Sequence, residues 1–187
     1  MSSRPHDHEG AMEPQVGDAH ANQYPAQPPG SAIEVEAVAP KATRVSRQEL
    51  IDRLNDDLAR EYQAIIAYVI YSQTLKGAAF MAVAQELESH AAQELGHAIT
   101  IAKHIDYLGG TPGATPRPVK VVDNANGMLR ADLENERLTI QAYRERLKQC
   151  EALEEYGIAE DLREILRQEQ EHLVDLSTAL GEAAPQI

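Results

Sequence analysis

The sequence contains the pattern Glu-x-x-His twice, in corresponding positions of two similar halves. The first copy is ELGH, residues 94–97, and the second is EQEH, residues 169–172. A single glutamate precedes each copy by the same distance, Glu61 before the first and Glu136 before the second. One constant offset, which we call the repeat interval, therefore takes Glu61 to Glu136, Glu94 to Glu169 and His97 to His172. The fold of this chain must accommodate two halves with matching sets of acids.

The acids lie on the apolar faces of helical segments. The apolar neighbours at helical spacing are Leu54, Leu58 and Ile65 around Glu61; Leu87, Ala91, Ala98, Ile101 and Leu108 around Glu94 and His97; and Leu129, Leu133 and Ile140 around Glu136. Apolar faces pack inward. The pattern therefore predicts that four helices direct carboxylates at one bundle axis.

Four helices are expected from periodicity and from the signals at their ends. Ser46 is suited to be an N-cap, and Glu49 three residues later completes a capping box. The expected helices cover residues 46–76, 78–108, 128–156 and 158–180. Glycines that would end or break helices stand between them, at Gly77, Gly109, Gly110 and Gly157.

The connection between the second and third helices is long and not helical. Residues 111–127, TPGATPRPVKVVDNANG, contain three prolines, yet they are long enough to run the length of a bundle. The prediction is an all-α, antiparallel four-helix bundle with one long crossover between helices two and three. It would occupy residues 46–181, after a disordered arm rich in Pro, Ala, Gln and Gly (1–45) and before a short tail (182–187).

Charge and composition exclude several classes of function. The net charge of −13 repels nucleic acid and anionic membrane surfaces. The single cysteine, Cys150, excludes an intrachain disulfide. There is no apolar run of the roughly 20 residues that span a bilayer, and the first residues lack the apolar core of a signal peptide. We therefore expect a cytoplasmic protein without a nucleic-acid or membrane partner.

Buried acids in such number require compensation. Four carboxylates and two imidazoles in a bundle core repel one another strongly, and two divalent cations would cancel the four negative charges. Protons shared among the carboxylates are an alternative, but they would not need the histidines. Ion pairs with Lys or Arg are disfavoured, because these faces contain almost no basic residues. Carboxylate and imidazole ligands without thiolate suit iron or manganese, and zinc can also occupy such a site.

Further residues recur at the repeat interval around the expected site. Asp57 and Asp132 each lie one helical turn before a single glutamate, and they would either orient the histidines or lie exposed. Tyr68 and Tyr143 lie two turns after those glutamates and would hydrogen-bond the carboxylates, supply an electron or only pack. His90, one turn before Glu94, would be an accessory iron site or an ordinary polar residue of its helix.

These motifs resemble those of the ferritin-like di-iron carboxylate proteins, and among them the bacterioferritins. The resemblance covers roughly residues 46–181, and the segments MLRADLENE (128–136) and EILRQEQEH (164–172) are particularly similar to bacterioferritins. It implies that the ligands of two iron ions are Glu61, Glu94, His97, Glu136, Glu169 and His172. It also implies that Tyr68 is the family's tyrosine beside that centre, the candidate catalytic side chain.

Three departures from the family pattern modify what the resemblance implies. Leu95 stands where bacterioferritins have a haem-binding methionine, so no haem is expected. Only the segment GEAAPQI follows Leu180, too short for the fifth helix of typical ferritins, which leaves a smaller shell or a dimer open in place of the usual large cage. Thr139 stands where rubrerythrins have an additional glutamate, and the rubredoxin cysteines of that family are absent.

Three functional hypotheses follow. The first is a homo-oligomeric protein that oxidises Fe(II) with O2 or H2O2 for iron storage or detoxification. The second is a di-iron or di-manganese peroxidase or oxidase that stores nothing. The third is a metal-binding assembly subunit, or cargo of a larger shell, without enzymatic activity. Storage requires a hollow oligomer and the other two do not, so assembly size separates them.

Overall fold

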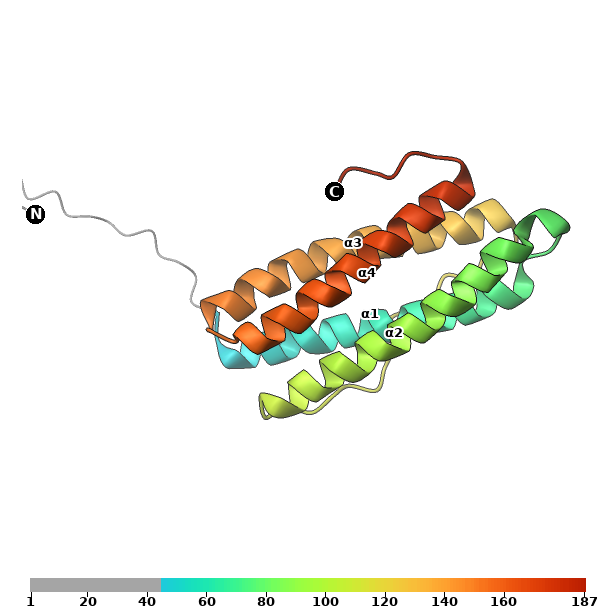
Figure 1. The fold of residues 1–187 in the computed structure, drawn as a ribbon. Helices are drawn as coiled ribbons and strands as arrows, with labels where there is room; N and C mark the ends of the chain where they lie inside the picture. Colours follow the sequence, from blue (N-terminus) through green and yellow to red (C-terminus); the bar gives the residue numbers. More distant parts are fainter. Residues whose placement is uncertain (1–44) are drawn as a thin grey trace, which may run out of the picture. The chain divides into compact units, whose positions relative to one another are not determined.

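A computed structural model describes residues 45–187, and the predicted arm therefore lies outside the described residues except for its last position. The described part of the chain forms four long α-helices, one short 3-10 helix and no strand (Figure 1). The helices are α1 (Arg47–Thr74), η1 (Ala78–Phe80), α2 (Met81–Tyr107), α3 (Ala125–Ala152) and α4 (Tyr156–Leu180). Within this part, no helix is long and apolar enough to cross a membrane.

The helices form the expected antiparallel bundle. Two hairpins, α1–α2 and α3–α4, pack side by side, mainly through α1 and α3 (Figure 1). Contacts are most extensive within each hairpin, whereas α2 and α4 approach each other closely at few positions. The α2–α4 side is consequently the open side of the bundle.

The connection between the hairpins crosses the length of the bundle, as predicted. It runs alongside α1 in the same direction. The backbone N–H of Arg117 donates to the Ala59 carbonyl at 2.9 Å, and the Gln63 side chain donates to the Pro118 carbonyl, also at 2.9 Å. Further along α1, the Tyr71 hydroxyl donates to the Lys120 carbonyl. These bonds satisfy polar backbone groups in a segment that prolines keep out of regular structure.

The helix ends agree with the predictions only in part. α1 begins with the predicted capping box, in which Ser46 and Glu49 satisfy each other's backbone N–H groups. α3 begins earlier than predicted, at Ala125 instead of residue 128, because the Asn124 side chain accepts a hydrogen bond from the Gly127 N–H at 2.8 Å and acts as the N-cap.

The prediction that Gly157 separates the last two helices was wrong. α3 ends at Ala152 and α4 begins at Tyr156, so Gly157 lies inside α4. The turn is made instead by Glu154, which has a positive φ of 60°. The carboxylate of Glu155 next to it accepts from the Arg47 guanidinium at 2.7 Å, which ties this turn to the start of α1.

Two apolar clusters fill the bundle, one toward each end. The first contains Leu54, Ile101, Tyr143 and Leu162 among others, and the second contains Tyr68, Leu87, Leu129 and Leu176 among others. Each helix runs from one cluster to the other. The predicted ligands occupy the stretch of each helix between the clusters, so the polar layer is enclosed by apolar side chains above and below.

Candidate metal centre

All six predicted ligands meet in the polar layer at the middle of the bundle. Each of the four helices contributes. The residues are Glu61 from α1, Glu94 and His97 from α2, Glu136 from α3, and Glu169 and His172 from α4. None of the six is more than 4% exposed. Helical spacing accounts for the arrangement, because a glutamate and a histidine three positions apart project from adjacent turns of the same face.

The six side chains form two groups that share two members. Each group could hold one ion, with its potential ligand atoms within 4.8 Å of one another. One consists of Glu61, Glu94, His97 and Glu169, and the other of Glu94, Glu136, Glu169 and His172. The shared residues are the glutamates of the two Glu-x-x-His patterns. If two ions were bound, these shared glutamates could bridge them, while Glu61 and Glu136 would each complete one group.

Distances from the two imidazoles support this division. Nδ1 of His97 lies 3.1 Å from Glu94 Oε2, 3.1 Å from Glu169 Oε1 and 3.3 Å from Glu61 Oε2. Nδ1 of His172 lies 3.0 Å from Glu94 Oε1, 3.5 Å from Glu169 Oε2 and 3.9 Å from Glu136 Oε1. Each bridging carboxylate thus turns one oxygen toward each histidine.

Several of these atoms are buried without a hydrogen-bond partner. They are Glu61 Oε2, Glu94 Oε1, both carboxylate oxygens of Glu169, and Nδ1 of His172. An unpaired buried carboxylate oxygen is costly, and buried charges in proteins are either paired or coordinate a metal ion. The donor set of carboxylates and imidazoles fits a pair of divalent first-row transition metals.

The raised pKa values of three carboxyl groups in the centre favour their protonated forms when no cation is bound. Burial raises the pKa of Glu94, Glu136 and Glu169, and neighbouring negative charges raise it further. Burial also acts on Glu61, but hydrogen bonds with His97 and Glu94 and the charge of His97 outweigh it and lower the pKa of Glu61. Binding of cations to these residues must therefore release protons.

Two tyrosines connect the halves of the centre. The Tyr68 hydroxyl on α1 donates to Glu136 on α3, and the Tyr143 hydroxyl on α3 donates to Glu61 on α1. Both are fully buried, and burial together with the adjacent carboxylates raises the pKa of both phenols well above the ordinary value. Of the roles considered from sequence, the structure shows the hydrogen bond to a carboxylate.

Two glutamines that were not predicted from the sequence hold the histidines. Nε2 of His97 lies 2.9 Å from Gln168 Oε1, and Nε2 of His172 lies 2.6 Å from Gln93 Oε1. The amide oxygen accepts from the Nε2–H tautomer, which leaves Nδ1 free to bind a cation. Gln93 and Gln168 are related by the repeat interval and each directly precedes a glutamate of the centre, so the repeat contained the signal.

The two repeated aspartates do not have either predicted role. Asp57 is buried and accepts from Arg146 at 2.6 Å, an ion pair that contradicts both the expected histidine contact and the expected exposure. Arg146 is itself buried, so one of the few basic side chains on the inward faces pairs with Asp57. Asp132 is also buried, and its Oδ2 has no hydrogen-bond partner. Burial and the charge of Glu136 raise the pKa of Asp132 to about 8.

Comparisons with known proteins agree with this fold and centre. Residues 51–184 match the family model of the ferritin-like domain. A bacterioferritin of Brucella melitensis is 28% identical over 133 residues, covering 71% of this chain and 83% of its own. A bacterioferritin of Desulfovibrio desulfuricans is 30% identical over 129 residues, covering 68% and 72% respectively.

Two solved structures show the same architecture. A ferritin-like di-iron carboxylate protein of Bacillus anthracis has a TM-score of 0.70 and 34% identity, and the match covers 72% of this chain and 96% of that one. A dodecameric thioferritin, the bacterioferritin-related protein of Bacteroides fragilis, has a TM-score of 0.68 and 27% identity, over 74% and 88% of the two chains. From the family match and from these relatives, the chain belongs to the ferritin-like family and is close to the bacterioferritins.

Proposed function

We propose that this protein binds two Fe(II) ions per subunit at the six-residue centre and oxidises them with O2 or H2O2, for iron storage or detoxification. The observation that carries the proposal is the pair of four-residue groups that share Glu94 and Glu169. Two ions held by common carboxylates can each give one electron to the same oxidant. O2 with two protons then yields H2O2, and H2O2 with two protons yields two waters.

The iron supplies the electron transfer, and the side chains fix where it occurs. Gln93 and Gln168 hold the imidazoles in the tautomer that presents Nδ1. Tyr68 and Tyr143 each donate to one of the single glutamates, which restricts the rotation of those carboxylates. We propose Tyr68 as the catalytic tyrosine, in line with the family resemblance. Protons released from Glu94, Glu136 and Glu169 on iron binding are available to the reduced oxidant.

The bridging geometry gives a graded test by substitution. Glu169→Ala removes a member of both groups and should abolish binding of both ions, whereas Glu61→Ala or Glu136→Ala should leave about one ion bound per subunit. Anaerobic titration with Fe(II) measures this. All three variants, together with His97→Ala and His172→Ala, should lose the rapid phase of oxidation in stopped-flow absorbance, because the two-electron step needs both ions.

A matched control separates loss of a ligand from general effects on the fold. Glu145→Ala removes an exposed glutamate of α3 that, among the described residues, pairs only with Lys148. This variant should bind two ions and oxidise them at the wild-type rate. Rapid oxidation that persists in both histidine variants would rule out the di-iron assignment.

We also propose that the protein is a homo-oligomer, because the Bacteroides relative is a dodecamer. The native mass of the assembly, with its iron content after aerobic loading, would separate a storage protein from an oxidase. Many Fe(III) ions per subunit in a hollow assembly support storage, and about two per subunit support the non-storing alternative. Haem is not expected to bind, since Leu95 occupies the ligand position on the exposed surface of α2.

A further inference from the structure

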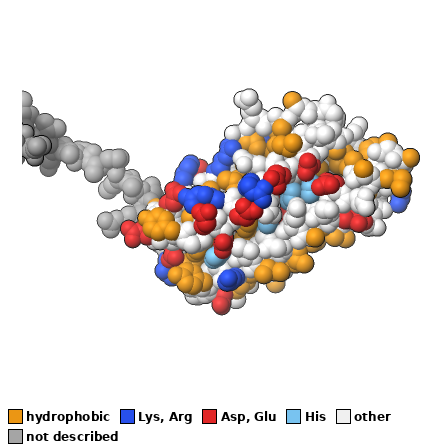
Figure 2. All heavy atoms as spheres, in the orientation of Figure 1, with side chains coloured by type: hydrophobic (Ala, Val, Ile, Leu, Met, Phe, Trp, Pro, Cys, Tyr) orange, Lys and Arg blue, Asp and Glu red, His pale blue; other side chains and the backbone are white. Residues whose placement is uncertain are grey.

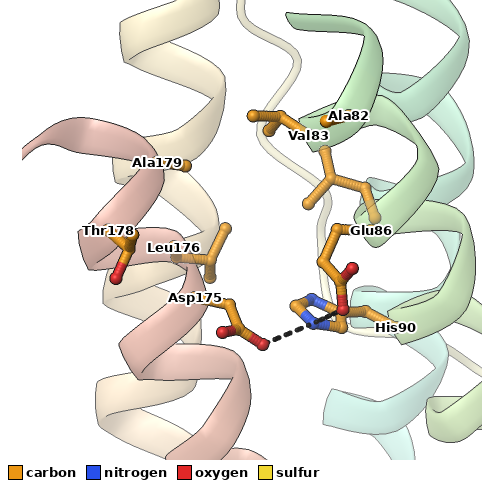
Figure 3. Close-up of a pocket in the computed structure, with 9 residues that line it drawn as sticks. Ala82, Val83, Glu86, His90, Asp175, Leu176, Thr178 and Ala179 are labelled. Carbon is orange, nitrogen blue, oxygen red and sulfur yellow. Dashed lines mark ion pairs between the residues drawn. The ribbon is translucent and has the colours of Figure 1, made fainter.

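A third group of potential metal ligands lies one turn away from the centre, on the open side of the bundle. Nε2 of His90 on α2 lies 3.5 Å from Glu86 Oε1 on the same helix and 3.5 Å from Asp175 Oδ2 on α4. The close-up in Figure 3 shows the Asp175 carboxylate directed from α4 toward the His90 imidazole on α2, with the Glu86 carboxylate next to that ring. The three potential ligand atoms lie within 4.8 Å of one another.

The environment of His90 is unusual for a structural histidine. Its side chain is 2% exposed, and its Nδ1 has no hydrogen-bond partner among the described residues. The ring stacks on that of His172, with centroids 4.0 Å apart, and meets the Tyr68 ring edge-on at 5.3 Å.

The two carboxylates have no cationic side chain to balance them. Glu86 and Asp175 are about half exposed, and within residues 45–187 neither forms an ion pair with Lys or Arg. Arg167 lies nearby along the same opening, but it pairs with Glu164 and Glu171. The group therefore presents two carboxylates that have no Lys or Arg partner in this part of the chain.

The group is accessible from solvent through two adjoining pockets. One, of about 230 Å³, lies between α2 and α4 and is otherwise lined by apolar residues such as Val83 and Leu176. The other, of about 590 Å³, extends from His90 to His172 and Gln93. Figure 2 shows histidine side chains reaching the surface on this face, with carboxylates beside them. A cation can therefore approach the group from this side of the bundle.

The opposite half of the bundle lacks this group, although the repeat places a similar pocket there. The pocket beside His97 is lined by Ile165 and Thr100, which the repeat interval relates to His90 and Asp175 respectively. Asp161 is the equivalent of Glu86, but its carboxylate pairs with His104 at 2.8 Å. The opening on that side, within the described residues, has no imidazole at the position equivalent to His90.

We propose that Glu86, His90 and Asp175 form a third metal site, which takes a divalent transition-metal ion such as Fe(II), Mn(II) or Zn(II) and exists only on the His172 side of the bundle. One imidazole nitrogen with two carboxylates is a ligand set for these metals, with water completing the coordination. The site requires no redox step and does not depend on ferroxidase activity.

The test is a direct location of the ion. Crystals of the full chain soaked with Zn(II) should show an anomalous-scattering peak bonded to His90 Nε2 and to both carboxylates, in addition to peaks at the centre. Zn–N and Zn–O distances of about 2.0–2.2 Å are expected. Absence of a peak at this position at millimolar Zn(II) would overturn the proposal.

Titration with Zn(II) tests the same site in solution through His90→Ile, which installs the residue of the opposite half. The variant should bind one ion fewer per subunit than the wild type. Asp161→Asn changes the equivalent pocket and should bind as many ions as the wild type. Because the result is a difference of one ion, it holds whether or not the centre itself binds two.

A second variant keeps the proposal testable if His90→Ile disturbs the adjacent His172. Asp175→Asn changes a half-exposed side chain, and it should weaken binding of the additional ion at least about tenfold, with the other ions unaffected. Equal Zn(II) binding by wild type, His90→Ile and Asp175→Asn would show that this group holds no metal.

Discussion

The α1–α2 and α3–α4 halves of the bundle agree at the metal centre and differ one helical turn away from it. Each half contributes two glutamates, a histidine, a tyrosine and a glutamine at positions related by the repeat interval. Asp57 and Asp132 are also related by this interval, but their surroundings differ. Arg146, the ion-pair partner of Asp57, has Tyr71 as its equivalent, and His90 has Ile165.

The difference shows which parts of the repeat the centre requires. Two similar four-residue groups need matching residues from both halves. Because the groups share Glu94 and Glu169, substituting either of these glutamates changes both groups at once. The residues above and below the polar layer belong to different ends of the bundle, so their sequences need not match. The two four-residue groups thus have equivalent members but different surroundings, with an Arg–Asp ion pair at one end and an unpaired Asp132 at the other.

The largest effect is expected from removing the ion pair that only one half has. Arg146→Met should leave Asp57 buried without its partner and reduce the free energy of unfolding by about 3–5 kcal/mol at pH 8. Urea denaturation in the presence of a chelator measures this. Arg163→Met, which removes ion pairs on the exposed surface, should cost less than about 1 kcal/mol. Equal effects of the two variants would contradict the role assigned to Arg146.

The half with the unpaired aspartate should show a characteristic pH dependence. Because the pKa of Asp132 is raised to about 8 in the folded state, the folded protein binds a proton that the unfolded chain releases near pH 4. Its contribution to stability is complete below about pH 4 and is lost as the pH rises through about 8.

Asp132→Asn should therefore be more stable than the metal-free wild type at pH 8, by several kcal/mol, since each pKa unit of the shift corresponds to about 1.4 kcal/mol, and the gap should close toward pH 4. Urea midpoints across this range measure the difference. Asp106→Asn, at an exposed position of α2, serves as the control and should follow the wild-type curve. A gap that is constant with pH would mean that Asp132 does not titrate as described.

The smallest effect concerns the contacts that cross between the halves. Gln93→Ala should lower the affinity for the ion at His172 by about 10- to 100-fold, and Gln168→Ala should lower the affinity for the ion at His97 by a similar factor. Titration with Co(II) would measure both affinities. In a His172→Ala background, Gln93→Ala should have no further effect, whereas Gln168→Ala should still weaken the remaining ion. An exposed control, Gln85→Ala, should leave both affinities unchanged.

The helices could be predicted from the sequence more reliably than the turns between them. Apolar periodicity and the capping box of Ser46 are local, and they located α1 almost to the residue. The turn between α3 and α4 could not be predicted in the same way. There Glu154 adopts a positive φ that is usual for glycine, and the nearby Gly157 continues the helix. Arg47, at the start of α1 and far away in the sequence, stabilises this turn through Glu155, and local rules do not include such a contact.

The meeting of the six buried acids and imidazoles was predictable because the repeat is internal to the sequence. Their surroundings were not, because these depend on which helices become neighbours. His172 is held by Gln93 from the other half of the chain, and Asp57 by Arg146, 89 positions further along. Asp57 lies one helical turn before Glu61, and one expectation was that it would orient a histidine of the same site. In the bundle Asp57 instead meets a side chain from an adjacent helix.

The sharing of Glu94 and Glu169 also affects how the two hairpins are held together. Each four-residue group takes three members from one hairpin and its fourth, a bridging glutamate, from the other. Neither hairpin has a complete group, so metal binding at the proposed centre would be coupled to docking of the hairpins. Each bound ion stabilises the docked state by RT ln(1 + [M]/Kd). A chelator should accordingly separate the two hairpins from each other before it unfolds either of them. The hairpins would remain covalently joined through the crossover connection.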